Sequence, residues 1–526
     1  MSALVAADGV TPLRASSFRA NSSYRGADRL SQELGNWLPS LTSPGGELHW
    51  ERDALVARAR DIERNNGYAR GIKHTLLEGV IGANWRLSAK PNWRALGIDY
   101  KTAIAWSTIT EAKFRVYADD PGCWIDAGRR LRFGGLLRAQ FATWFTTGEH
   151  LGLMVWLPER MKLGRARYAT AVQIVDPDRL SNPSGAPETP ELRSGVALGE
   201  HNEAVGYWIR DGHPADTAAA HLSYQWTYVP RETEWGRPIV LHGFDCERDG
   251  QVRAATPLAA VIETLRMQDV YERGEAAAAI LNAIFAAVLE TPLANDPELA
   301  EQQLGAVRKA DESGEERVEL RLGGVRVPQL PTGTNLKFLN AARPAAPAFA
   351  QFEEAVLRRV AAGMGLSYEQ VARDYSKTNY SSARAALLES WKMLTGRSEF
   401  MASSFADHVY ACWLEEAIDR EEIELPAGAP DFYEARAEWT ACRWIGPGRG
   451  AIDPTKERQA SQMAIDTGLS TMEDEAAAEG KDWLENAEQR AYERAVYADL
   501  GLGPDAGQAV YRVNTTQSDA AAAAGA

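Results

Sequence analysis

The sequence predicts a mixed α+β fold, in which an α/β first half is followed by a mostly helical second half. Between about residues 169 and 244, short runs of strand-like alternation are separated by turns. Prolines interrupt these runs at Pro177, Pro183, Pro187, Pro190, Pro214, Pro230 and Pro238. From residue 256 onward, apolar residues recur mainly at helical spacing. With 526 residues, 45% of them hydrophobic and 25% charged, the chain has the composition of a globular protein and the length for several structural units.

The elements of the first half follow from periodicity. Residues 1–50, rich in Ser, Gly and Pro, are predicted to form an extended arm. A helix is expected from about 51 to 79, divided in two at Asn65-Asn66-Gly67. The elements expected after it are a strand at 80–87, helices at 100–118 and 129–147, and strands at 151–157, 204–210 and 238–244.

A long helix is predicted to open the second half. Thr256 and Pro257 are a start signal, with Thr as the N-cap and Pro at the first helical position. The helical pattern continues to Thr291-Pro292, with Gly274 as the expected bend. The elements expected after it are a helix at 296–310, strands at 318–322, 324–327 and 336–339, a helix at 347–364, a long helix capped by Ser381 or Ser382, helices at 454–467 and 471–500, and a disordered Ala-rich end at 519–526.

Charge and cysteine content limit the classes of function. A formal charge of −15 argues against a tight grip on nucleic acid, because affinity for phosphates comes from cations, but it does not exclude a protein past which DNA slides. The cysteines are far apart and form no CxxC pair, so we expect a reducing compartment and no disulfide framework. No signal peptide is expected, and the longest apolar stretch, 276–289, is too short to cross a bilayer.

The common catalytic motifs are missing from the sequence. The Gly480-Lys481 pair is followed by Asp482 and preceded by no glycine-rich loop, so an ATP-hydrolysing motor is not expected. No GxSxG and no HExxH motif occurs. His201, His213 and His221 are close in sequence but lack regular ligand spacing. We therefore predict no enzyme activity, no metal and no cofactor.

Three segments resemble the portal proteins of lambda-like tailed phages. The first is RARDIERNNGYAR at 58–70, followed by VIG at 80–82. The second is VDPDRL at 175–180, followed by GRP at 236–238 and QVR at 251–253. The third, and the most specific, is RRVAAGMGLSY at 358–368 with RDYSKTNYSSAR at 373–384. The resemblance covers about residues 50 to 500 and is weakest in the arm, in 292–340 and at the end of the chain.

This resemblance implies a portal fold with an α/β wing, a long helical stem, a small α/β clip, a tunnel helix and a helical crown. The expected divisions are an N-terminal arm at 1–50, the wing at 51–255, stem helix 1 at 256–291, the clip at 292–346, stem helix 2 at 347–364, a tunnel loop at 365–381, the tunnel helix and wing return at 382–450, the crown at 451–514 and a disordered tail at 515–526.

The tunnel loop is the part of the chain that the resemblance places closest to DNA. Lys377, Asn379 and Tyr380 are expected to touch phosphates, with Arg373 and Arg384 behind them. The alternative is structural, in which Asn379 and Ser381 cap a helix while Tyr375 and Tyr380 pack. Packaging must accept every base sequence, so any contacts are expected to be few, weak and directed at the backbone.

The resemblance also implies partners and a place in the cell. The expected assembly is a homo-oligomeric ring, usually of twelve subunits, in the virion at a capsid vertex, after assembly in the host cytoplasm. The expected partners are double-stranded DNA, the large terminase subunit, the major capsid protein and head-completion or adaptor proteins, with no membrane. The alternatives are a head-maturation or DNA-processing enzyme and a ring or adaptor protein that does not conduct DNA. A long stem helix containing Ala276–Ala279 suits close packing between neighbouring subunits, or else the core of one subunit.

Overall fold

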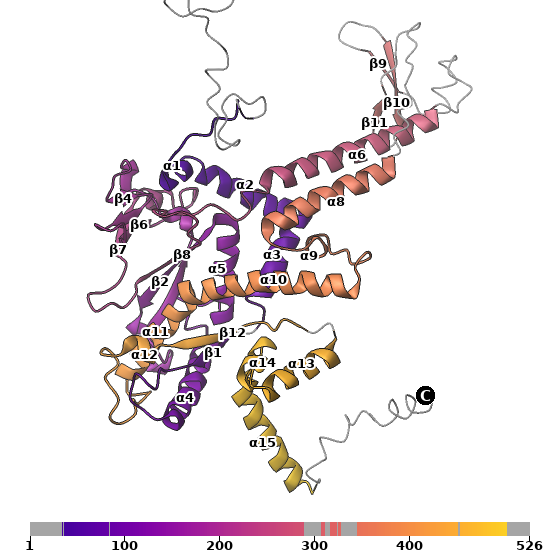
Figure 1. Ribbon diagram of the computed structural model, residues 1–526. Helices are drawn as coiled ribbons and strands as arrows, with labels where there is room; N and C mark the ends of the chain where they lie inside the picture. The colour runs from indigo at the N-terminus through magenta and orange to yellow at the C-terminus, as the bar shows by residue number, and fades with distance from the viewer. Residues whose placement is uncertain are drawn as a thin grey trace, which may run out of the picture.

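The computed structural model describes residues 34, 36–83, 85–288, 307–310, 316–322, 325–327, 345–450 and 453–501. It confirms the mixed α+β class. Figure 1 shows a body of helices and small sheets, from which α6 and α8 extend together, with α13–α15 gathered below α10. The predicted elements at 1–33, 289–306 and 336–339 and the C-terminal tail lie outside the described residues.

The predicted division of the first long helix is confirmed. After the short α1 (Pro44–Leu48), α2 (Arg52–Asn65) and α3 (Gly67–Val80) meet at Asn66. The side chain of Asn66 accepts hydrogen bonds from the backbone of Tyr68 and Ala69, which caps α3 and turns the chain at this point.

The strand predicted at 80–87 is wrong in position. Val80 is the last, fully buried residue of α3, and the strand that follows is β1 (Arg86–Ala89). β1 pairs antiparallel with β12 (Cys442–Ile445), more than 350 residues away, so local alternation does not reveal where the pairing starts. Helices α4 (Tyr100–Asp119) and α5 (Phe133–Thr147) confirm the next two predictions.

Two antiparallel sheets follow α5. The first has the order β3-β2-β8 and is formed by β2 (Glu149–Trp156), β3 (Thr170–Val175) and β8 (Val240–Phe244). The second has the order β4-β5-β6-β7 and is formed by β4 (Leu192–Arg193), β5 (Val196–Leu198), β6 (Ala204–Arg210) and β7 (Trp226–Pro230). The predicted strands at 151–157, 204–210 and 238–244 correspond to β2, β6 and β8.

The turn before β2 depends on a glycine. Gly148 has a φ of 85°, and a Cβ atom at this position would lie 2.0 Å from the carbonyl oxygen of Ala255. Only glycine allows both this backbone conformation and this approach. The contact ties the end of α5 to the segment that leads into α6.

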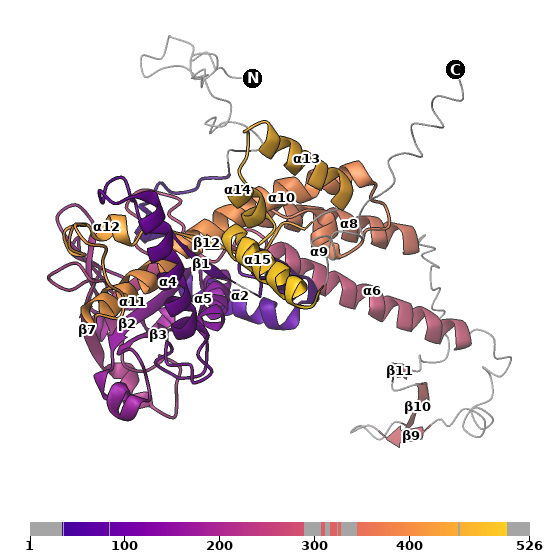
Figure 2. The same cartoon turned by 90° about the horizontal axis from the view of Figure 1, so that it is seen from below.

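The long helix α6 (Ile262–Val288) begins later than predicted. The Thr256 side chain does accept the backbone N–H of Leu258, but residues 257–261 form turns, and the regular helix starts only at Ile262. α6 continues through Gly274, the position of the predicted bend, as one helix. Both views show α6 leading away from the body (Figures 1 and 2).

A three-stranded sheet of order β11-β10-β9 lies between α6 and α8 in the sequence. It consists of β9 (Val307–Ala310), β10 (Glu316–Leu322) and β11 (Val325–Val327). β10 and β11 correspond to two predicted strands. The helix predicted at 296–310 is wrong at its end, because 307–310 pair as a strand with β10.

The chain returns through α8 (Ala345–Met364), α9 (Tyr368–Ala372) and α10 (Tyr380–Met401). A π-helical turn at Ala402–Ala406 joins α10 to α11 (Asp407–Asp419), and α12 (Arg436–Trp439) precedes β12. The side chains of Leu394, Met401 and Phe405 are buried along one side of this stretch.

The C-terminal helices are α13 (Pro454–Asp466), α14 (Met472–Ala478) and α15 (Trp483–Asp499). The single helix predicted at 471–500 is therefore two helices. Gly480, with a φ of 73°, lies between them in the left-handed conformation that interrupts a helix.

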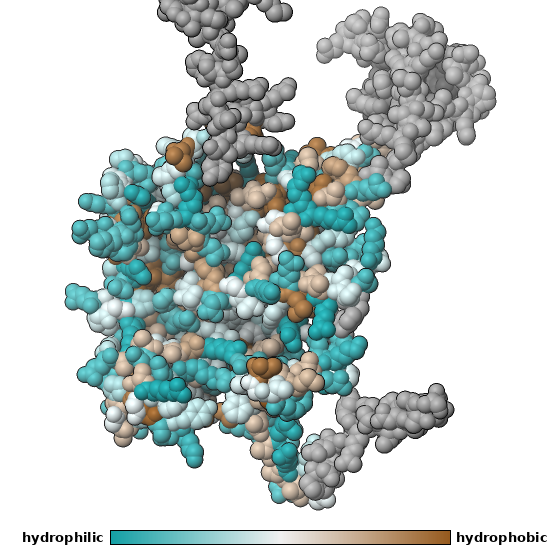
Figure 3. Space-filling view, in the orientation of Figure 1, coloured by the Kyte–Doolittle hydropathy of each residue, from teal (hydrophilic) through white to brown (hydrophobic). Residues whose placement is uncertain are grey.

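The main core is rich in aromatic residues. Phe114 of α4 makes edge-to-face contacts with Phe133, Tyr410 and Trp413, which come from α5 and α11. A smaller core lies between the sheet β4–β7 and strands β2 and β8. On the face shown in Figure 3, apolar side chains are scattered among hydrophilic ones. Among the described helices, none combines the length and apolarity that crossing a bilayer requires.

Candidate functional site

The segment between α8 and α10, together with the first turns of α10, holds the residues predicted to face DNA, and it contains a short helix that was not predicted. α8 ends at Met364, and Gly365 follows with a φ of 70°. α9 then begins after Ser367, whose side chain forms a reciprocal capping box with Gln370. The spacing Ser-x-x-Gln is typical of a capping box, so this short helix could have been predicted from the sequence.

Arg373 and Lys377 lie at the surface and contact the helices on either side. Arg373 ends α9 with a φ of 54°, and its Nη2 lies 3.3 Å from Oγ1 of Thr75 in α3. The Nζ of Lys377 lies 3.2 Å from Oε2 of Glu354 in α8, although the Lys377 side chain is 76% exposed. Glu354 also pairs with Arg358, at 2.6 Å. Exposed pairs of this kind are weak, so both cations are free to exchange partners.

Asn379 is the N-cap of α10. Its Oδ1 accepts hydrogen bonds from the backbone of Ser382 and the hydroxyl of Ser381, both at 2.9 Å, while Ser382 Oγ accepts the backbone N–H of Asn379. The predicted cap at Ser381 or Ser382 is therefore wrong by two or three residues, because Asn and Ser are equally good caps and the sequence does not rank them. The structure shows the capping role for Asn379, while its contact with DNA stays a prediction.

The remaining predicted residues differ in their surroundings. Tyr375 is 61% exposed, so it does not pack as the structural alternative supposed. Arg384 is exposed on the first turns of α10 and makes no ion pair within the described part of the chain. Tyr380 is the first residue of α10, and its side chain lies outside the described residues.

These positions together form an exposed segment suited to brief contacts with a polyanion. Arg373, Lys377 and Arg384 supply positive charge. Hydrogen bonds from Ser376 lower the pKa of Asp374, so one carboxylate lies between the cations and limits the local positive charge. The segment can attract phosphates without holding them tightly.

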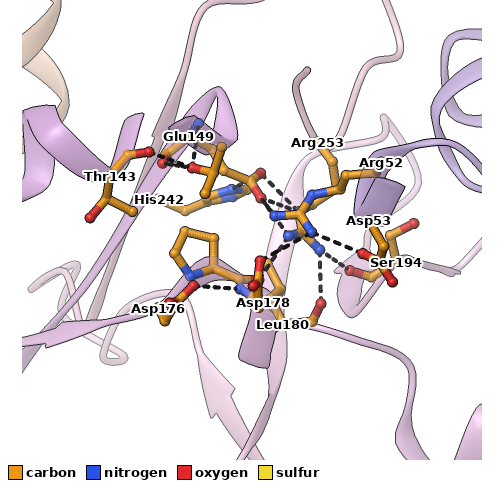
Figure 4. A network of polar contacts seen from close by, with 12 residues as sticks. Arg52, Asp53, Thr143, Glu149, Asp176, Asp178, Leu180, Ser194, His242 and Arg253 are labelled. Atoms are coloured by element: carbon orange, nitrogen blue, oxygen red, sulfur yellow. Dashed lines mark hydrogen bonds and ion pairs between the residues drawn. The ribbon is translucent and has the colours of Figure 1, made fainter. Parts of the chain in front are cut away.

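A buried polar network lies beside the segment that leads into α6 and was not recognised in the sequence (Figure 4). Glu149, at the start of β2, is fully buried and bonds to the guanidinium groups of Arg52, at 2.6 Å, and Arg253. Nε2 of His242 in β8 lies 3.1 Å from the same carboxylate. Burial acts to raise the pKa of Glu149, but the charges of Arg253 and Arg52 outweigh it and hold that pKa well below its usual value.

This network joins parts of the chain that are distant in sequence. Arg253 also donates to the carbonyl oxygens of Pro177, Leu180 and Ser194, at 2.8–2.9 Å. It therefore ties the loop after β3 and the turn before β5 to the segment that enters α6. No local pattern marks Glu149, because Gly148 and His150 flank it; its only sequence signal is its place just before a predicted strand. A carboxylate is buried there only with partners, and these come from distant parts of the chain.

The side-chain atoms of Asp176, Asp178 and His213 are close enough to bind one metal ion, but both carboxylates already pair with a cationic side chain. Arg60 pairs with Asp176 at 3.0 Å and with Asp178 at 2.5 Å. Of the three histidines that lie close together in sequence, only His213 belongs to this group.

His150 and Ser404 form a second buried pair, with Nε2 of His150 2.8 Å from Oγ of Ser404. Burial lowers the pKa of His150 to about 3, and its Nδ1 has no hydrogen-bond partner among the described residues. A nucleophilic triad needs an acid at that nitrogen and a substrate at the serine. This pair instead joins β2 to the π-helical turn after α10.

Comparison with known proteins gives consistent sequence matches. The family described as "Phage portal protein, lambda family" matches residues 31–397. The portal protein of Escherichia phage N15 is 36% identical over 540 aligned positions, covering 99% of both chains. Portal protein B of Escherichia phage lambda is 35% identical, covering 96% of this chain and 94% of its own. A probable portal protein of Halomonas phage phiHAP-1 is 23% identical, covering 83% of this chain and 79% of its own.

Solved structures are similar at a lower level. A chain in the neck of an empty gene transfer agent particle matches with a TM-score of 0.38 and 12% identity, covering 69% of this chain and 87% of that one. A chain in the neck of the native particle matches with a TM-score of 0.37 and 10% identity, covering 80% and 94%.

Proposed function

This chain belongs to the lambda family of phage portal proteins, and from that premise we propose that the loop between α8 and α10 faces the double-stranded DNA passing through the portal. As a member of this family, the protein is a structural subunit of a portal ring at a capsid vertex of the virion. The family membership favours neither the DNA-processing enzyme nor the non-conducting ring considered from the sequence.

We propose the following division of the chain, on the basis of the family. Residues 51–255 are the wing, α6 and α8 are the stem pair, 292–346 are the clip, α10 is the tunnel helix, and 451–514 are the crown. The pairing of α6 with α8 supports the stem. Tyr271 of α6 stacks on Phe349 of α8, with ring centroids 5.8 Å apart, and contacts the tilted ring of Phe352 at 4.5 Å.

The observation that carries the DNA proposal is the exposed run from Arg373 to Lys377. Helix α9 and the Asn379 cap fix both ends of this run, while its cations have only weak contacts. A fixed loop with weakly held cations allows contact with each passing phosphate and prompt release, which a moving duplex requires.

A photo-crosslinking amino acid tests this proposal in DNA-filled particles. Replacing Tyr375, which is 61% exposed, is expected to give covalent attachment to DNA after irradiation. Replacing Tyr228 of β7, which is 44% exposed and belongs to the proposed wing, is the matched control and is expected to give none. Attachment at both positions, or at neither, contradicts the placement of the loop.

Charge removal supplies an independent test on purified rings. Lys377→Ala and Arg384→Ala are each expected to reduce the salt dependence of DNA binding by about one released counterion, whatever the DNA sequence. Glu389→Gln, on the exposed side of α10, is the control for altering charge near the loop without removing a cation. If DNA affinity depended on salt concentration equally in the natural protein and in both variants, Lys377 and Arg384 would not contact the DNA.

The same reasoning identifies a surface for the neighbouring subunit. A groove of about 680 Å³ between α2 and α6 is lined largely by apolar residues, including Leu55, Met267 and Val270. Val270 is 58% exposed, and the Ala276–Ala279 run farther along α6 is exposed as well, so this run is not in the core of its own subunit. A ring-forming protein covers such a face with another copy of itself, and we assign the groove and this stretch of α6 to the subunit interface.

The remaining expectations rest on the family alone. We propose that the assembly has twelve subunits, that the large terminase subunit docks on the clip, that the major capsid protein surrounds the wing, and that head-completion or adaptor proteins bind after packaging. Assembly in the host cytoplasm before incorporation into the virion belongs to the same proposal.

A further inference from the structure

The three C-terminal helices bury none of their side chains completely. Neither α13, α14 nor α15 contains a buried residue. Several large apolar side chains in this region are mostly exposed, namely Met463, Leu469, Met472, Tyr492 and Leu500. The helices therefore have no core of their own, and their position depends on how they are attached to the body.

Ion pairs make much of that attachment. Glu485 of α15 pairs with Arg86 of β1 and with Arg115 of α4, at 3.1 Å from the latter. Glu473 of α14 lies 2.7 Å from Lys90. A fourth pair joins Asp474 of α14 to Arg443 of β12, at 3.1 Å.

The β1–β12 ribbon places two of these cations, Arg86 and Arg443, on one face. Ser88 is directly opposite Arg443, so the side chains of Arg86, Ser88 and Arg443 share one face, while Leu87 and Trp444 occupy the other. In the helices that cover this face, residues 453–501, acidic residues outnumber basic ones. The two surfaces are therefore complementary in charge.

All the partners in these pairs are partly exposed, with side-chain exposures between 36% and 55%. Such pairs contribute little each and weaken as salt screens them. The apolar part of the contact is small, since Trp483 and Leu484 are only half-buried.

The seam between the helices and the body is incompletely filled. A cavity of about 540 Å³ lies between α4, β1 and the start of α15, and one of about 390 Å³ lies between α10, β12 and α14. A close backbone approach occurs at Gly448, where a Cβ atom would lie 2.5 Å from the backbone of Glu479. Arg449 N–H also donates to the carbonyl of Ala478 there, at 3.1 Å.

We propose that residues 453–501 form a lid held on the cationic face of β1–β12 by a salt-sensitive electrostatic latch centred on Glu485. The docked and released states differ by a few screened ion pairs, a small apolar contact and the short backbone contact of residues 448–449 with 478–479, so the lid detaches while the body stays folded. Release uncovers Arg86, Lys90, Arg115 and Arg443 together. This inference does not depend on the DNA contact of the loop between α8 and α10.

Hydrogen exchange on the full-length assembled protein tests the latch. Raising NaCl from about 0.05 M to about 0.5 M is expected to speed exchange in α14 and α15 by about tenfold, because released helices without a core unfold readily. Exchange in α5, inside the main core, is the internal reference and is expected to stay constant. Equal protection of α14 and α15 at both salt concentrations contradicts the proposal.

A charge swap separates the latch from general destabilisation. Glu485→Arg places a cation beside Arg86 and Arg115 and is expected to release the lid even at low salt. The triple variant Glu485→Arg, Arg86→Glu and Arg115→Glu restores opposite charges and is expected to restore protection. Glu78→Arg, which reverses an exposed pair with Arg138 away from the lid, is the matched control. Failure of the triple variant to recover protection, with α5 still protected, overturns the proposal.

Discussion

Glu149 shows how a single buried charge fixes the entrance to α6. It is inaccessible to solvent, and its carboxylate is the shared partner of Arg52 and Arg253. A buried pair adds little net stability when it is intact, but removing one partner leaves an uncompensated charge in the interior. The network therefore specifies how the segments around β2 meet, and its loss is costly.

Glu149→Gln is expected to destabilise the protein by about 3–5 kcal/mol, because Arg52 and Arg253 lose their counter-charge. Thermal unfolding measured at neutral pH checks this effect as a large fall in Tm. Glu78→Gln, which removes one side of an exposed pair with Arg138, is expected to change stability by about 1 kcal/mol or less. Equal Tm values for the two variants would contradict the role given to Glu149.

Glu111 of α4 makes stability depend on pH. Burial raises its pKa from the usual 4.5 to about 7, and the nearby Asp482 carboxylate adds to the effect. The folded protein therefore keeps a proton on Glu111 up to about pH 7, whereas the unfolded chain releases it near pH 4.5. The stability that this proton provides is complete below pH 4.5 and is lost as the pH rises to 7.

Glu111→Gln removes this dependence. The variant is expected to match the natural protein near pH 4 and to exceed it at pH 8 by about 3 kcal/mol, since it has no charge to bury. Unfolding curves at a series of pH values check the prediction. A constant difference across the series would mean that Glu111 does not titrate in this range.

At the scale of elements, the sequence predicted structure well where the signals are local. The division of the first helix at Asn66 and the end of α8 before Gly365 follow from a cap residue and a glycine at the position concerned. The exposed loop after α9 was also expected, together with its cations. The capping role of Asn379 was expected only as the alternative to a DNA contact, and its side chain is engaged in starting α10.

The wrong predictions share a physical cause, because each element concerned depends on residues that are distant in the sequence. β1 begins at Arg86 because β12 pairs there, and Val307–Ala310 is a strand because β10 lies beside it. The helical start at Thr256 was displaced because its hydroxyl also donates to the carbonyl of Phe145, which holds a turn before α6. The buried network around Glu149 likewise needs residues about 100 positions apart.

Asn379→Ala tests the cap at the tip of α10. The loss of its side-chain acceptor is expected to cost about 1 kcal/mol and to fray the first turns of α10. Hydrogen exchange within residues 380–390 is the measurement, with Asn379→Asp as the variant that keeps the acceptor and the protection. Unchanged exchange in Asn379→Ala would show that another residue caps the helix.

At the scale of the whole molecule, one subunit leaves large surfaces uncovered. The α2–α6 groove is open, and Met267 and Val270 beside it are about half exposed. In a closed ring each such surface meets a copy of the same chain, and the free energy gained by burying it is repeated at every interface.

Val270→Asp is expected to weaken ring assembly, because it places a charge in the apolar face of α6 without disturbing the core of the subunit. Mass photometry over a range of protein concentrations checks the shift toward smaller species. Val205→Asp on β6, at a position that is 43% exposed and away from the groove, is the control and is expected to assemble normally. Equal assembly of the two variants would remove this surface from the interface.

The most direct test of the whole account is negative-stain electron microscopy of the purified protein, with mass photometry on the same sample. The expected result is rings with a central channel and a mass near twelve times the 57.6 kDa of one chain. Closed particles without a channel, or a protein that remains monomeric at every salt and protein concentration and fails to form rings with its capsid partners, would contradict it.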